Sequence, residues 1–133
     1  MTVTRLSRFL EEIRTWAETR PDIAAVVLVG SQAQGQATSE SDVDLVILTV
    51  QPERYLQDPS WVESFGRPSR QTQEDWGRVT AVRVWYQDGL EVEFGIATPD
   101  WAHAPLDPGT RQVLDAGFVA VFDREGLPVL RHS

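Results

Sequence analysis

The sequence contains no cysteine and no lysine, and each absence excludes familiar kinds of site. A chain without cysteine forms no disulfide, binds no metal through thiolate and uses no cysteine nucleophile. A chain without lysine cannot carry a Walker A phosphate loop, which ends in G-K-[ST]. All 12 basic residues are therefore arginine, and against 20 acidic residues they leave a formal net charge of -8. This balance makes nucleic acid an unlikely partner and favours a cationic small molecule or a protein.

Long apolar runs are also lacking. None approaches the roughly 20 residues that a membrane helix needs, and the first residues show no signal-peptide pattern. We therefore expect a cytoplasmic protein without a membrane association. With 133 residues, of which 41% are hydrophobic, the chain is long enough to bury its own core, and we expect one domain over residues 1–133.

The apolar pattern predicts a mixed α/β chain without internal repeats. Apolar residues at helical spacing predict an amphipathic helix over 4–19, and shorter helices are expected within 30–38, 53–70, 98–101 and 109–115. Strands are expected over 23–29, 43–50, 80–86, 90–97 and 118–122. The strand over 23–29 is continuously apolar, which predicts burial on both of its faces.

Two carboxylates and a glycine-serine turn lie between the first two strands. Asp42 and Asp44 open the second strand and share one face, with Cα atoms about 6.6 Å apart. Like charges this close favour protonation unless a cation lies between them, and Mg²⁺ is usually held by one or two carboxylates plus substrate phosphates. Gly30 and Ser31 follow the first strand directly, where backbone N–H groups can bind an anion. The pattern indicates nucleotide chemistry.

Gly30-Ser31, ten intervening residues and Asp42-Val43-Asp44-Leu45 resemble the signature of the DNA polymerase beta-like nucleotidyltransferase superfamily. Residues 65–126 further resemble the catalytic domain of aminoglycoside 6-adenylyltransferases, in Phe65-Gly66, in the segment 88–94 and in the segment 121–126. That family continues into a large helical domain, and it more often has aspartate at the position of Glu93. The resemblance implies a nucleotidyltransferase core of α+β type, with a mixed sheet of four to five strands and helices packed on one face.

The resemblance also implies a reaction. A nucleoside monophosphate, expected to be AMP from ATP, would pass to an unidentified acceptor, either a small molecule or a protein. Asp42, Asp44 and Glu93 would hold two Mg²⁺ ions, and Gly30 and Ser31 would bind the β- and γ-phosphates. Two alternatives remain open: an antitoxin-like or regulatory minimal nucleotidyltransferase that acts with a helical protein partner, and a non-catalytic nucleotide binder.

Glu91 and Glu93 compete for the third carboxylate position, because both lie on the same face of one strand. Counted from the Asp88-Gly89 turn, Glu93 takes the place of the family's aspartate. We expect Glu91 to lie in water or to accept a hydrogen bond beside the site. Trp76, Trp85 or Trp101 could stack on a base, whereas His103 and His132 lack a metal-ligand partner at useful spacing.

Overall fold

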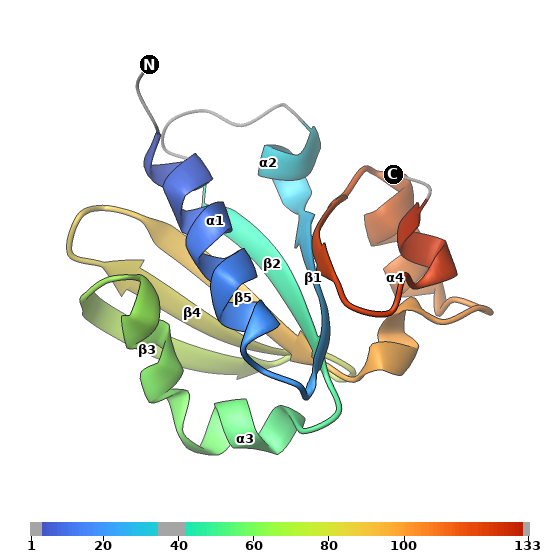
Figure 1. Ribbon diagram of the computed structural model, residues 1–133, viewed down its shortest axis with the longest axis horizontal. Helices are drawn as coiled ribbons and strands as arrows, with labels where there is room; N and C mark the ends of the chain where they lie inside the picture. The colour runs from blue at the N-terminus through green and yellow to red at the C-terminus, as the bar shows by residue number, and fades with distance from the viewer. Residues whose placement is uncertain (1–3, 35–41, 132–133) are drawn as a thin grey trace.

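The computed structural model describes residues 4–34 and 42–131. Six strands form one mixed sheet in the order β3-β4-β5-β2-β1-β6. Their bounds are β1 Ile23–Val29, β2 Val43–Thr49, β3 Pro68–Asp75, β4 Thr80–Tyr86, β5 Glu91–Ala97 and β6 Val119–Asp123. Strands β2 and β5 pair in parallel, and the other neighbours pair antiparallel. The parallel pair at the middle of the sheet brings two segments together that lie far apart in the sequence (Figure 1).

The first helix, α1 Arg5–Glu18, covers one face of the sheet (Figure 1). It begins at Thr4, whose hydroxyl accepts a hydrogen bond from the Ser7 N–H at 3.0 Å and so satisfies one of the unpaired donors of the first turn. Its apolar side buries Phe9, Ile13 and Trp16. The same face of the sheet is covered by the short helix α3 Pro52–Gln57 and by the 3-10 helix η1 Pro59–Phe65.

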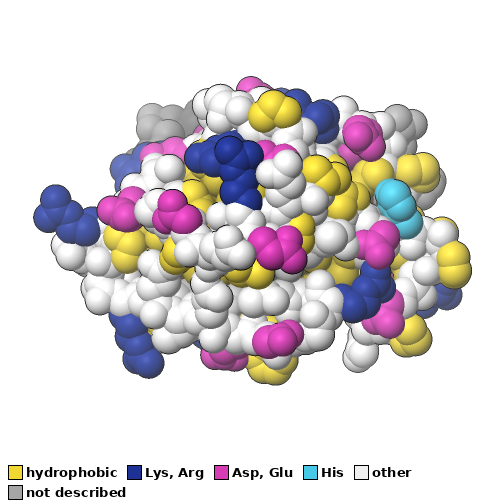
Figure 2. Space-filling view, turned by 90° about the horizontal axis from the view of Figure 1, so that it is seen from below, with side chains coloured by type: hydrophobic (Ala, Val, Ile, Leu, Met, Phe, Trp, Pro, Cys, Tyr) yellow, Lys and Arg dark blue, Asp and Glu magenta, His cyan; other side chains and the backbone are white. Residues whose placement is uncertain are grey.

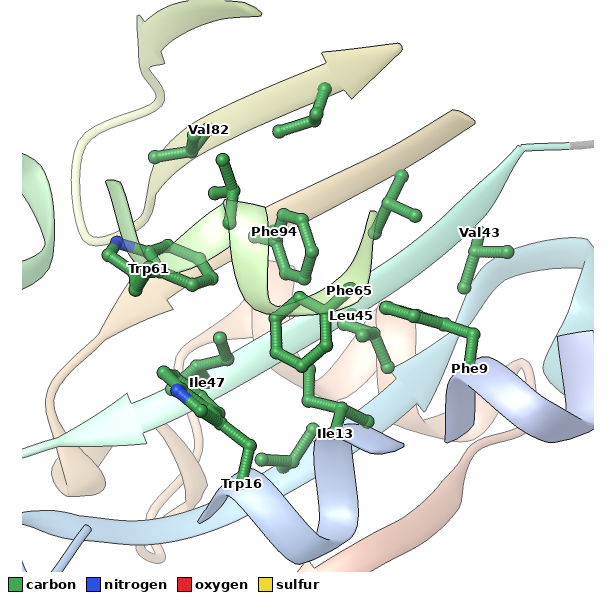
Figure 3. Close-up of a cluster of buried hydrophobic side chains, with 14 of the residues drawn as sticks. Phe9, Ile13, Trp16, Val43, Leu45, Ile47, Trp61, Phe65, Val82 and Phe94 are labelled. Atoms are coloured by element: carbon green, nitrogen blue, oxygen red, sulfur yellow. The ribbon is translucent and has the colours of Figure 1, made fainter. Parts of the chain in front are cut away.

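Aromatic rings fill the core beneath α1 (Figure 3). The Phe94 side chain is fully buried, and its ring centroid lies 4.9 Å from that of Trp61 and 5.9 Å from that of Phe65. Val43, Leu45 and Ile47 of β2 reach the same cluster, since alternate residues of a strand share a face. The intervening residues of β2 therefore point to the opposite face, and these include Asp44.

The opposite face carries a second layer of structure. There α4 Pro108–Asp115 and two 3-10 helices, η2 Pro99–Ala102 and η3 Pro128–Arg131, pack on a separate apolar cluster. Ala25, Val27 and Val29 of β1 belong to this cluster, whereas Val26 and Leu28 belong to the first. Both faces of β1 are therefore covered, as its continuous apolar run predicted.

The predicted fold class is confirmed, and two of its details differ. The sheet has six strands instead of four or five, because β3 had no recognisable pattern. Helices cover both faces instead of one, since α4 lies on the side opposite to α1. The predicted helix within 30–38 is α2 Gly30–Gln34, and the rest of that range lies outside the described residues.

The described helices offer no candidate for a membrane span, because none is both long and apolar enough. On the surface seen from below, basic side chains are dispersed among acidic and polar ones and do not gather into one basic face (Figure 2).

Candidate active site

Strand register places the predicted carboxylates side by side. Asp44 of β2 lies directly opposite Glu93 of β5 in the parallel pair, and Glu93 lies opposite Arg83 of β4. These three side chains form one row across the sheet, on the face opposite to α1. Asp42 precedes β2 by one residue and is two residues from Asp44, so it points to the same side.

Asp42, Asp44 and Glu93 converge closely enough to share a cation. Each offers one carboxylate oxygen, these three oxygens all lie within 4.8 Å of one another, and all three residues are partly buried. A set of carboxylate oxygens suits a hard divalent ion such as Mg²⁺ or Mn²⁺. The structure thus brings together the three residues that the sequence had indicated.

The electrostatics of Asp44 also fit a cation. Burial is the largest of the effects that raise its pKa to about 7. The negative charges of Asp42 and Glu93, and a hydrogen bond with Glu93, act in the same direction, while the positive charge of Arg83 opposes them. A carboxyl group with such a raised pKa lies where negative charge is in excess, and a divalent ion would relieve that excess.

Gly30 leaves the room that Asp44 needs. Val29 pairs with Asp44 in the sheet, so the chain turns out of β1 directly beside this carboxylate. A Cβ atom at position 30 would lie 2.5 Å from Asp44 Oδ2, closer than side chains approach one another. Gly30 also has a φ of 75°, in the left-handed region that favours glycine. Backbone conformation and space therefore both require glycine here, and Ser31 follows in the first turn of α2.

Glu91 occupies a different place from Glu93. Its Oε2 atom accepts hydrogen bonds from Arg83 Nε at 2.9 Å and from Arg83 Nη2 at 2.5 Å. Arg83 Nη2 also donates to Asp42 Oδ2 at 3.1 Å. The sequence had left open whether Glu91 lies in water or accepts a hydrogen bond beside the site, and the structure shows the second arrangement. Reasoning from the sequence had missed Arg83.

A cavity of about 840 Å³ is lined by two of the carboxylates, Asp44 and Glu93, and by Gly30. Apolar parts of β2, β4 and β5, one side of α4 and the β3–β4 turn form most of the remaining wall. Cavities of this size, mainly apolar with a few charged groups, are typical of small-molecule sites.

The three tryptophans named as possible base-stacking residues differ in position. Trp76, in the β3–β4 turn, lines the cavity and is 64% exposed. Trp101 also lines it but is buried in the second apolar cluster. Trp85 instead lies against two guanidinium groups, those of Arg70 and Arg83. Trp76 is therefore the tryptophan best placed to contact a ligand in the cavity.

A family comparison identifies the kind of protein to which this geometry belongs. The family model described as streptomycin adenylyltransferase matches residues 5–105, which include all of the candidate carboxylates and Gly30. The chain belongs to this family. No curated protein is similar enough to this chain to count as a match.

Solved structures show the same fold. An aminoglycoside 6-adenyltransferase from Bacillus subtilis matches with a TM-score of 0.59 and 14% identity, covering 76% of this chain and 37% of that one. The Cid1 poly(U) polymerase matches with a TM-score of 0.50 and 18% identity, over 69% of this chain and 29% of the polymerase. A cytoplasmic RNA terminal U-transferase gives 0.51 and 17%, over 68% and 28% of the two chains.

These findings confirm the resemblance to the DNA polymerase beta-like nucleotidyltransferase superfamily. The matched structures are much longer than this chain, which covers only 28% to 37% of their length. Because their identities are below 25%, the solved structures establish the fold alone. The family match adds nucleotidyl transfer as the general chemistry of the family.

Proposed function

We propose that the protein transfers a nucleoside monophosphate, AMP from ATP, to an acceptor that is a small molecule or a protein. The observation that carries this proposal is the convergence of carboxylate oxygens of Asp42, Asp44 and Glu93 within 4.8 Å, two of which, Asp44 and Glu93, line a cavity. In the reaction, an acceptor group forms a bond to the α-phosphorus while the bond between this phosphorus and the pyrophosphate breaks. The acceptor loses its proton to water.

The carboxylates supply the binding site for divalent metal. Asp42, Asp44 and Glu93 would hold two Mg²⁺ ions together with oxygens of the triphosphate. When bound, such ions stabilise the attacking and leaving oxygens of an in-line displacement. The protein's own residues mainly position the reactants, as is general in phosphoryl transfer. Gly30 and Ser31 would contact the β- and γ-phosphates beside Asp44.

The cavity provides space for the rest of the donor and for the acceptor. Asp44 and Glu93 line it, so the α-phosphate would lie beside them. Its mainly apolar lining, which includes the exposed Trp76, offers a surface on which a base or another flat group can stack.

Isothermal titration with a non-hydrolysable ATP analogue tests the proposal. We expect binding in the presence of Mg²⁺ and much weaker binding in its absence. Glu93→Gln should lose the Mg²⁺-dependent binding, because the acidic triad of Asp42, Asp44 and Glu93 then lacks one carboxylate. Glu74→Gln is a matched control, since it makes the same chemical change on an exposed residue of β3 that does not line the cavity. Equal weak heats with and without Mg²⁺ for the unmodified protein would refute the proposal.

A further inference from the structure

Arg83 places a positive charge against the candidate metal site. Its Nη2 atom lies 3.1 Å from Asp42 Oδ2, and it belongs to the row of residues that contains Asp44 and Glu93. Its side chain is only 32% exposed, so water screens this charge less than it would at the open surface. Arginine cannot lose its proton in a protein, and the charge is therefore permanent.

Glu91 fixes the position of that charge. It accepts from two nitrogens of Arg83 at 2.9 and 2.5 Å, which leaves the guanidinium bridging Glu91 and Asp42. The Trp85 ring adds a third contact, with its centroid 5.5 Å from the guanidinium carbon. Glu91 and Trp85, which do not belong to the acidic triad, thus hold Arg83 beside Asp42.

We propose that Arg83 is a positioning residue that pairs with Asp42 when no metal is bound and competes with divalent metal for this carboxylate, while Glu91 anchors it. This inference rests on the proposed function, because it requires that metal binds at Asp42, Asp44 and Glu93. In the metal-free protein Arg83 compensates part of the negative charge of the triad. In the metal-bound protein it faces a second, larger positive charge.

The size of the competition follows from the geometry. A metal bonded at about 2.1 Å to the same Asp42 oxygen would lie no more than about 5 Å from Arg83 Nη2. Even at the dielectric constant of water, repulsion between a unit charge and a divalent ion at about 5 Å weakens binding roughly tenfold. A metal that takes this oxygen must in addition break the Arg83–Asp42 hydrogen bond.

The experiment measures binding of Mn²⁺ alone by calorimetry, without any nucleotide. Arg83→Gln should bind Mn²⁺ about tenfold more tightly than the unmodified protein. Its metal-free form should melt at a lower temperature, since Asp42 and Glu91 lose their common partner. Arg83→Lys keeps the charge and should stay closer to the unmodified protein than Arg83→Gln does. An arginine that only supports the fold would give the opposite result, with weaker Mn²⁺ binding in both variants.

Glu91→Gln provides a second test, with the opposite sign. Loss of the anchor frees Arg83 to pair more strongly with Asp42, and the site also loses one negative charge, so Mn²⁺ binding should weaken several-fold. The effect of Glu91→Gln should shrink in the presence of Arg83→Gln, because the released arginine is then gone. Arg70→Gln is the matched control, because the Arg70 guanidinium carbon lies 4.8 Å from the same Trp85 ring, and Arg83 is the arginine that pairs with Asp42 and Glu91 in the described part of the chain. Mn²⁺ binding by Arg70→Gln should stay near that of the unmodified protein.

The outcomes separate the inference from the proposed function. If the unmodified protein binds no Mn²⁺, the proposed metal site and the inference both fail. If it binds Mn²⁺ and Arg83→Gln binds no more tightly, the metal site stands and the role of Arg83 is refuted. If Arg83→Gln does not fold, a Glu91→Gln variant that binds Mn²⁺ as tightly as the unmodified protein, or more tightly, refutes that role as well.

Discussion

Replacement of Gly30 by alanine should abolish metal binding through a single methyl group. At a φ of 75° an alanine is strained by about 1 to 2 kcal/mol relative to glycine. The added Cβ would lie 2.5 Å from Asp44 Oδ2 and 3.3 Å from its Cγ, so the carboxylate must move by several tenths of an ångström at least. A metal site with bonds of about 2.1 Å and near-ideal octahedral geometry does not tolerate such a displacement.

Gly89→Ala separates the two effects. Gly89 also has a positive φ, 99°, but among the described residues other than its chain neighbours no heavy atom lies within 4 Å of the position where its Cβ would be. The backbone strain is therefore similar in the two variants, and the contact with Asp44 is present only in Gly30→Ala. Urea unfolding should show a loss of about 1 to 2 kcal/mol for Gly89→Ala and a larger loss for Gly30→Ala.

The decisive measurement is Mn²⁺ binding by calorimetry on both variants. We expect Gly89→Ala to bind as the unmodified protein does and Gly30→Ala to show no binding. If Gly30→Ala folds and binds Mn²⁺ as well as Gly89→Ala, then Asp44 does not need the space beside Gly30 and this account of the site is wrong.

Four substitutions probe the site and the fold. Glu93→Gln should abolish nucleotidyl transfer, whereas Glu91→Gln, which leaves the three candidate carboxylates in place, should keep most of it at saturating Mg²⁺. Pyrophosphate release measured at graded Mg²⁺ concentrations distinguishes the two variants. An inactive Glu91→Gln and an active Glu93→Gln would exchange the roles of the two glutamates. Burial opposes ionisation of Asp22, but hydrogen bonds from Tyr55 at 2.6 Å and from a threonine hydroxyl hold its pKa below the ordinary value. The charge therefore stabilises the fold at pH values above the ordinary pKa, and this stabilisation is lost as the pH falls below that value and through the lower pKa of the folded protein. Asp22→Asn should therefore lower the melting temperature at pH 7 by a few degrees and by less near pH 3. Phe94→Ala should cost about 3 to 5 kcal/mol in urea unfolding, because it empties a fully buried aromatic site, and a cost below about 1 kcal/mol would contradict the packing described.

The strands that the sequence predicted are those with an apolar pattern. The bounds of β1 and β4 were exact, and those of the other predicted strands were correct within one residue at each end. Strand β3 reads P-S-R-Q-T-Q-E-D and contains no large apolar residue, so no alternation can be recognised. It lies at the edge of the sheet, where β4 is its one neighbour among the described strands. An edge strand of this kind forms because β4 offers backbone hydrogen bonds, and a proline at its first position is compatible with that place.

The carboxylates could be predicted because a motif carries them, whereas Arg83 is recognised only through strand pairing. Arg83 alternates with Val82 and Val84, which places it on the polar side of β4. The turn centred on Asp88 pairs Arg83 with Glu93, and this register could have been predicted from the sequence. The parallel register that sets Asp44 against Glu93 could not be predicted, because β2 and β5 are joined by a long connection that fixes no alignment.

The wall of the cavity opposite the sheet comes from α4, which begins at Pro108, after the end of the family match at residue 105. This helix is held by Leu114, which is buried in the second apolar cluster, and it presents Thr110 and Val113 to the cavity. The carboxylates proposed to hold metal and this α4 part of the cavity wall thus belong to different parts of the chain. In the proposed reaction the carboxylates would have to meet the fixed geometry of a phosphate and its metal ions, whereas α4 would only have to fit the group that lies against it. We therefore expect substitutions in α4 to change which molecule is bound without changing the chemistry proposed at Asp42, Asp44 and Glu93.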